Sequence, residues 1–216
     1  MSWLATLFPS RSGITDEQAM WRVQVHDDPE AFGEIVRRWQ EPVRRLCIRM
    51  TGGAHIGEDL AQEAFIRVFG HRHRFQQGRK FSTWLWRIAL NLCHDEARSV
   101  GRRGEFPLDE DAEDSAAMQA AELSPDEQMI ETERAELVRG ALMRLPETHR
   151  AVVVLREYEG LKLREIAEVL GIPEGTVKSR MADALTQLSR RLRPVLEDEF
   201  EPTSQTVEPM KERLVL

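Results

Sequence analysis

Residues 71 to 103 bring aromatic and cationic side chains together at close spacing. The stretch interleaves four aromatic with five basic residues: Phe75, Phe81, Trp84 and Trp86 among Arg72, Arg74, Arg79, Lys80 and Arg87. Aromatic faces stack on unpaired bases while cations follow phosphates, which suits an opened nucleic-acid strand better than an intact duplex. The alternative places Trp84 and Trp86 in a core and the arginines on a solvated face. We favour the core for Trp84 and nucleic-acid contact for the segment from Phe75 to Ser82.

A second stretch, REIAEVLGIPEGTVKSRM from Arg164 to Met181, reads as two short helices joined by a tight turn. Gly171 suits the left-handed backbone that ends a helix. The apolar residues that we expect to face inward are Ile166, Ala167 and Leu170 in the first helix and Val177, Met181, Leu185, Leu188 and Leu192 in the second. The polar residues left on the exposed first turns of the second helix are Thr176, Lys178, Ser179 and Arg180.

These exposed first turns are where a recognition helix contacts base edges, with hydroxyl groups more often on phosphates. A helical hairpin with a purely structural role would show the same turn. The basic residues that follow the second helix, Arg190, Arg191 and Arg193, favour DNA binding.

The apolar pattern that must position both stretches is helical throughout the chain. Thr15 with Gln18 forms a capping-box signature, and Asp28 followed by Pro29 predicts the start of a helix. One long apolar face follows and ends at Thr51-Gly52-Gly53; its members are Phe32, Ile35, Val36, Trp39, Val43, Leu46 and Met50. No alternating strand pattern occurs, so the sequence predicts an all-α fold.

Charge is distributed in blocks along the 216 residues. The chain carries a net −7, yet residues 105–127 hold nine acids without Lys or Arg, and residues 195–216 contribute −4. The remaining residues therefore carry a net +6. High charge with little to bury predicts a flexible acidic linker between two mildly basic helical modules.

This pattern divides the chain into five parts. We expect an N-terminal segment with a short helix (1–27), a first helical domain (28–104), the acidic linker (105–127), a second domain with the helix-turn-helix (128–194) and a tail (195–216). No apolar run reaches the roughly 18 residues of a membrane span, and the opening residues make a poor signal peptide. Cys47 and Cys93 lie in apolar helical patterns, which favours buried reduced thiols and a cytoplasmic location.

Three blocks in this order carry a family resemblance: EDLAQEAFIRVF, then KFSTWLWRIALN, then the helix-turn-helix with GTVKSR. Over roughly residues 28–103 and 128–193 the chain resembles an extracytoplasmic-function (group 4) sigma factor of bacterial RNA polymerase. The resemblance implies two small helical domains of the sigma-2 and sigma-4 type. It also implies a protein that binds core polymerase, recognises the −35 and −10 promoter elements and promotes promoter melting.

The resemblance also implies where each contact is made. Docking on the β′ clamp helices falls to Asp59, Gln62, Glu63 and Phe65. Contact with the −10 element and its melted strand, including a flipped base held by the loop from Phe75 to Ser82, falls to Phe75, Arg79, Lys80, Phe81, Ser82, Thr83, Trp84, Trp86, Arg87, Asn91, Arg98, Arg102 and Arg103. Contact with the −35 element falls to Glu174, Gly175, Thr176, Lys178, Ser179 and Arg180.

Further partners follow from the same resemblance. The second domain rests on the β flap, the acidic linker mimics RNA in a positive channel, and an anti-sigma factor is the inhibitory partner, with no direct membrane insertion. This chain departs from the family at Asp183, where many members have an arginine, because an acid there repels phosphate. Lys162 stands where a Ser or Thr cap is common, which costs about 1 kcal/mol of local stability.

Two other classes of protein compete with this interpretation. A conventional helix-turn-helix regulator that does not act through core polymerase is the alternative; a response regulator would need an α/β receiver pattern, which is lacking. A metal-dependent nuclease would need ligands such as His71, His73 and His94, but this spacing is a weak ligand signal. We therefore expect no catalytic residue, no metal and no cofactor.

Overall fold

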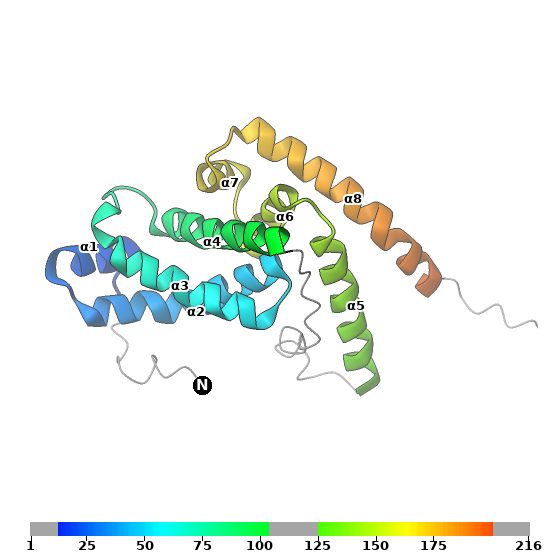
Figure 1. Ribbon diagram of the computed structural model, residues 1–216, viewed down its shortest axis with the longest axis horizontal. Helices are drawn as coiled ribbons and strands as arrows, with labels where there is room; N and C mark the ends of the chain where they lie inside the picture. Colours follow the sequence, from blue (N-terminus) through cyan, green and yellow to red (C-terminus); the bar gives the residue numbers. More distant parts are fainter. Residues whose placement is uncertain (1–12, 104–124, 201–216) are drawn as a thin grey trace, which may run out of the picture.

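The computed structural model describes residues 13–103 and 125–200, and within these ranges every regular element is helical (Figure 1). This confirms the all-α prediction. The elements are α1 (Asp16–His26), α2 (Pro29–Thr51), α3 (Ala54–Gly70), the short η2 (Arg72–Arg74), α4 (Phe81–Arg103), α5 (Pro125–Met143), α6 (Glu147–Val153), the π-helical η5 (Val154–Tyr158), α7 (Leu163–Leu170) and α8 (Glu174–Phe200).

Local sequence signals set the helix ends of the first module. The Thr15 hydroxyl accepts the Gln18 N–H at 3.2 Å, and the Gln18 side chain accepts the Thr15 N–H at 3.0 Å, so the expected capping box forms. The Asp28 carboxylate accepts two N–H groups of the first turn of α2, where proline follows it. Gly52 ends α2 with φ +84°, a conformation that a Cβ disfavours.

Helix α2 is the centre of the first module, with α1, α3 and α4 packed around it. Its predicted apolar face is buried at Ile35, Val36, Val43, Leu46 and Met50. The crossing with α3 is close because Gly57 lies against Ile48; a Cβ added at Gly57 would lie 2.8 Å from the Ile48 backbone nitrogen. Both cysteines are buried and unbonded.

The second module packs α6 and α7 against the long α8, and α5 closes one side. Gly171 ends α7 in the left-handed conformation, as predicted. The expected burial of Leu185 is wrong, because this side chain is 48% exposed and Ala184 is buried in its place. Seven residues separate Val177 from Ala184, two full turns, so the buried stripe passes through Ala184 and leaves Leu185 at its edge.

The two modules share one apolar core. Buried residues of α6, η5, α7 and α8 form a single cluster with those of α1 to α4, and Figure 1 shows α7 lying over α4. The buried Arg150 of α6 donates to the Met50 carbonyl at the end of α2 and to the Leu142, Met143 and Leu145 carbonyls of its own module. One guanidinium therefore joins the modules.

Several expected boundaries reach beyond the described residues. Helix α5 begins at Pro125, while residues 104–124, which hold most of the expected linker, lie outside the described ranges. Helix α8 continues to Phe200, so the first residues of the expected tail are helical; residues 201–216 lie outside. Within the described ranges, no helix is both long and apolar enough to cross a membrane.

We predict that Gly57→Ala lowers the free energy of unfolding by roughly 1–3 kcal/mol, because the new methyl group overpacks against the backbone of α2. Gly140→Ala in α5 is the matched control, since nothing lies within 4 Å of a Cβ there. That control should raise stability by up to about 1 kcal/mol through helix propensity. Urea denaturation followed by circular dichroism measures both, and a Gly57→Ala variant as stable as the parent would contradict the close crossing.

Candidate functional site

The segment between α3 and α4 is anchored by aromatic side chains that point into the core. Phe75 and Phe81 are buried, with ring centroids 6.0 Å apart, and the half-buried Trp84 lies 5.4 Å from Phe75 and 6.2 Å from Phe81. Trp86 is buried against Trp39. The core placement favoured for Trp84 agrees with this packing. In this arrangement Phe75, Phe81 and Trp86 have no ring face free for stacking on a base, and their contact with DNA stays a prediction.

The exposed part of this segment is polar. Residues 76 to 80 are all exposed, with Gly78 in the left-handed region at φ +85°. Arg79 and Lys80 therefore present their cationic groups at the tip, while Ser82 and Thr83 at the start of α4 are half-buried. The segment thus combines an aromatic anchor inside with hydrogen-bonding and cationic groups outside.

One face of α4 continues this polar surface. Arg87, Asn91 and Arg98 are exposed and recur at spacings of four and seven, which places them on one side of the helix. Arg98 is 3.7 Å from Asp95, an exposed pair that leaves the guanidinium accessible. Arg102 and Arg103 lie in the last turn of α4, and their side chains are outside the described set.

The second module contacts this same side of α4 and leaves Arg87, Asn91 and Arg98 exposed. The Lys80 ammonium lies 2.6 Å from the Glu165 carboxylate of α7, Arg87 donates to the Val169 carbonyl at 3.2 Å, and His94 contacts Glu147 of α6. Arg87 and His94 are seven residues apart on one side of α4, and Lys80 immediately precedes this helix. Lys80 and Arg87, two cationic residues that we expect to contact DNA, therefore contact α7 in this arrangement.

The contact between Lys80 and Glu165 perturbs both groups. The hydrogen bond and charge of Glu165 raise the pKa of Lys80, and the Lys80 hydrogen bond, followed by the Lys162 N–H, lowers the pKa of Glu165. A lowered carboxyl pKa gives a stabilisation that is fully present above the unfolded value of about 4.3 and is lost as the pH falls through the folded value. The Glu165 carboxylate also accepts the Lys162 N–H at 3.0 Å, which supplies part of the missing cap at the start of α7.

A second polar contact joins α2 to η5. The Arg49 guanidinium lies 4.1 Å from the centre of the Tyr158 ring and 4.0 Å from the Glu159 carboxylate. Burial lowers the pKa of Arg49 and raises the pKa of Glu159, so both charges are held at a desolvation cost that their attraction offsets. This pair could not be predicted from the sequence, because contacts between distant segments leave no periodic signal.

The first turns of α8 expose the polar groups predicted for a recognition helix. Glu174, Gly175, Lys178 and Ser179 are exposed, while Thr176 and Arg180 are half-buried. Lys178 pairs with Glu174 at 2.9 Å, and the Ser179 hydroxyl donates to the Thr176 carbonyl at 3.1 Å. Asp183, the acid that departs from the family pattern, lies 3.9 Å from the imidazole of His149 in α6.

The exposed stripe of α3 contains part of the set predicted to dock on core polymerase, and that docking stays a prediction. It consists of residues at helical spacing on one side: His55, Asp59, Gln62, Ile66 and Phe69. Asp59 and Gln62 belong to it, Glu63 is partly exposed and paired with Arg67 at 2.9 Å, and Phe65 is buried on the opposite side. Ile66, which is 65% exposed, was not among the predicted docking residues. Its position four residues after Gln62 and seven after Asp59 places it on the same side of the helix.

The three histidines considered as metal ligands have different surroundings. His71 and His73 are exposed near η2, and His94 contacts Glu147. Within residues 13–103 and 125–200, no group of three or more His, Cys, Asp and Glu side chains could hold a metal ion.

Comparisons with known proteins match both modules. Sigma-70 region 2 matches residues 35–103, and Sigma-70, region 4 matches residues 135–188. The chain is 36% identical over 172 residues to the ECF RNA polymerase sigma factor SigW of Bacillus subtilis, covering 77% of this chain and 91% of that relative.

Two solved structures share the fold. One is CnrH in complex with the cytosolic domain of CnrY, with a TM-score of 0.62 and 22% identity over 83% of this chain and 97% of that one. The other is the sigma factor RpoE in complex with the anti-sigma factor NepR from Bartonella quintana, with a TM-score of 0.59 and 24% identity over 75% of this chain and 96% of that one.

We predict that Lys80→Met raises the pKa of the Glu165 carboxyl towards its ordinary value, because the principal hydrogen bond that lowers it is removed. Arg164→Met is the matched control, since this neighbouring exposed cation pairs with Glu168 at 3.5 Å. Titration of the carboxyl carbon by NMR measures both. A Glu165 pKa that Lys80→Met leaves unchanged would show that α7 does not rest on this face in solution.

Proposed function

Because this chain belongs to the extracytoplasmic-function sigma factors of RNA polymerase, we propose that its two modules divide promoter recognition between them. The first module (28–104) holds the melted −10 element on the exposed segment 76–80 and the polar face of α4. The second (128–194) reads the −35 element with the first turns of α8. The separation of these two surfaces onto different modules is the observation that carries this proposal.

The chemistry of the α4 face supports its assignment to the −10 element. Arg79 and Lys80 at the tip, and Arg87 and Arg98 along the helix, are cations at spacings that can follow a phosphate backbone. Between them Asn91 offers both a donor and an acceptor to a base edge. The buried Phe75 and Phe81 support this surface from inside rather than stack on it, and Trp84, half-buried at its edge, is the ring nearest to solvent.

The described arrangement must open before both elements can be bound. The −35 and −10 elements lie roughly 25 base pairs apart, about 85 Å along B-DNA at 3.4 Å per step. Helix α8 begins four residues after α7 ends, and α7 rests directly on α4. The two reading surfaces therefore cannot lie so far apart here, and the linker 105–127 spans the distance after opening.

The exposed stripe of α3 is the surface that we assign to core polymerase. It combines Asp59 and Gln62 with the apolar Ile66 and Phe69, a mixture typical of a docking patch with an apolar centre and a polar edge. Glu63 and its partner Arg67 lie beside it. Phe65 supports this stripe from the core, so its predicted contribution to polymerase binding is through the position of α3.

The chain acts through partners rather than through a reaction of its own. Members of this family are initiation factors, so we assign it no catalytic step, no metal and no cofactor, and we place it in the cytoplasm with core polymerase. An anti-sigma factor is the proposed inhibitory partner, because the similarly folded RpoE of Bartonella quintana forms a complex with the anti-sigma factor NepR. An inhibitor that holds α7 on α4 would keep the −10 surface covered.

In vitro transcription tests this proposal. Bacterial core polymerase with this protein, on fragmented genomic DNA, should yield new transcripts whose upstream sequences share blocks at −10 and −35 spacing. Core polymerase alone is the control. Binding of the protein to specific DNA without core polymerase, and with no transcripts in its presence, would instead identify a conventional helix-turn-helix regulator.

We predict that Ile66→Asp weakens core polymerase binding about tenfold or more, because a carboxylate replaces the most exposed apolar side chain of the α3 stripe. Fluorescence anisotropy with labelled protein measures the Kd. Val25→Asp is the matched control, since Val25 is 56% exposed on α1 rather than on α3. Equal losses in the two variants, or no loss in Ile66→Asp, would refute this docking surface.

A further inference from the structure

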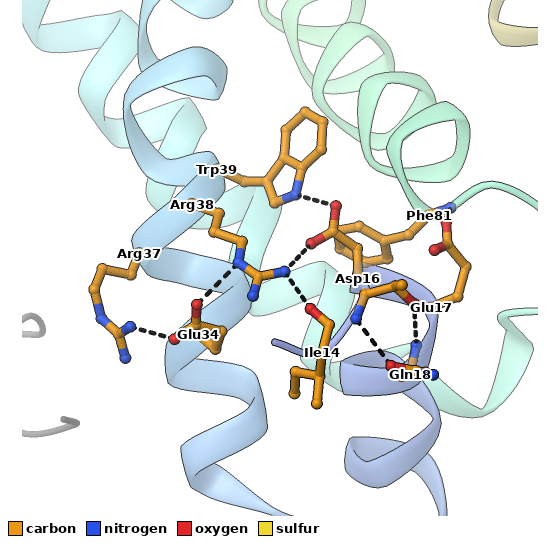
Figure 2. Close-up of polar contacts among 10 residues, drawn as sticks. Ile14, Asp16, Glu17, Gln18, Glu34, Arg37, Arg38, Trp39 and Phe81 are labelled. Atoms are coloured by element: carbon orange, nitrogen blue, oxygen red, sulfur yellow. Dashed lines mark hydrogen bonds and ion pairs between the residues drawn. The ribbon is translucent and has the colours of Figure 1, made fainter. Parts of the chain in front are cut away.

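Helix α1 lies outside the region matched to the sigma-70 family, which begins at residue 35. It is nevertheless firmly attached to the first module. Ala19, Met20 and Val23 are fully buried, and the Asp16 carboxylate accepts from Trp39 Nε1 at 3.0 Å and from Arg38 at 2.9 Å (Figure 2). The helix is therefore a fixed support and not a loose arm.

From this support, two side chains hold the two ends of the segment between α3 and α4. The Gln24 amide donates to the Arg72 carbonyl at 2.6 Å and to the Phe75 carbonyl at 2.8 Å, where the segment begins. The Glu17 carboxylate accepts the Phe81 N–H at 3.0 Å, where α4 begins (Figure 2). A third contact, the pair of Asp27 and Arg72 at 2.7 Å, adds to the first.

The spacing of these contacts fixes the shape of the segment. Glu17 and Gln24 are seven residues apart, so they lie on one side of α1 with about 10 Å between them. The two ends of the segment must match this distance, and the exposed residues 76 to 80 close the loop between them. Without Gln24, two carbonyls would lose their common donor, and the loop would gain conformations that binding must then restrict.

We propose that Gln24 and Glu17 are positioning residues that hold the segment from Phe75 to Lys80 in the shape that receives the flipped base of the −10 strand. This inference rests on the proposed function of the segment. Extraction of a base from the duplex costs a few kcal/mol, so a loop already in its binding shape lowers the remaining cost of melting.

The test uses complete holoenzyme, assembled from core polymerase and full-length variants of this chain. The probes are single-stranded −10 oligonucleotides from a promoter found by transcription, with all four bases at each position, and a −35 duplex. Gln24→Met keeps size and helix propensity but removes both donors. We expect it to weaken binding of the −10 strand about tenfold and to reduce discrimination between bases, with the Kd values for the −35 duplex and for core polymerase unchanged.

Two further variants separate positioning from general stability. Glu17→Gln keeps an acceptor oxygen for the Phe81 N–H and should bind the −10 strand like the parent, whereas Glu17→Leu should follow Gln24→Met. Met20→Ala is the control, because it destabilises the same helix through a fully buried side chain other than the two positioning residues. It should lower stability without changing base discrimination.

Three results would overturn the proposal. These are a Gln24→Met holoenzyme that discriminates bases like the parent, equal losses for the −10 strand and the −35 duplex, and a Glu17→Gln variant as impaired as Glu17→Leu. A parent holoenzyme that does not bind the −10 strand at all would refute the proposed function itself, which distinguishes the two failures.

Discussion

The closed arrangement of this protein depends on the buried guanidinium of Arg150. Two helices, α2 and α5, end beside it, and each leaves carbonyl groups without an intrahelical partner. Arg150 donates to Met50 in the last turn of α2 and to Leu142 and Met143 in the last turns of α5. Burial lowers its pKa, but an arginine keeps its charge, so one cation satisfies the negative ends of helices from both modules. The shared apolar core can close around this guanidinium because carbonyl oxygens replace the water that it loses.

A second constraint is that one face of α4 serves two purposes. Lys80, Arg87 and His94 contact α6 and α7 along the line that continues through Asn91 to Arg98. A helix face can be covered by only one layer of atoms. If the −10 strand binds along this face as proposed, α7 must first release Lys80 and Arg87, because its contacts occupy the same cationic groups.

Sequence alone predicted the features that are encoded locally. The capping box at Thr15 and the left-handed end at Gly171 each depend on a few neighbouring residues, and both were confirmed. Prediction was weaker at Leu185. Burial of Leu185 and burial of its neighbour Ala184 fit the helical spacing equally well, so only the helices packed against α8 decide which of the two is buried. Contacts between distant segments leave no trace in periodicity at all. Arg150 donates to a carbonyl one hundred residues earlier, and the acceptors of Gln24 lie about fifty residues away. The predicted contacts with DNA and core polymerase stay predictions, while the residues that support the segment between α3 and α4 from behind were found only in the structure.

Lys80 lies between two contacts of the segment that joins α3 to α4, the support from α1 and the contact with α7. Its neighbour Phe81 donates to Glu17, while its own ammonium pairs with Glu165. Arg87 likewise donates to carbonyl oxygens at the end of α7, where the helix dipole is negative. Phosphate and α7 therefore offer the same kind of acceptor to the same two cations. In the proposed opening on DNA, these charge-assisted contacts would be exchanged for contacts with phosphate rather than lost, which would lower the cost of opening on DNA relative to opening in solution. The Glu165 carboxylate and the carbonyl end of α7 thus occupy the two cations that we propose to contact DNA, until phosphate replaces them.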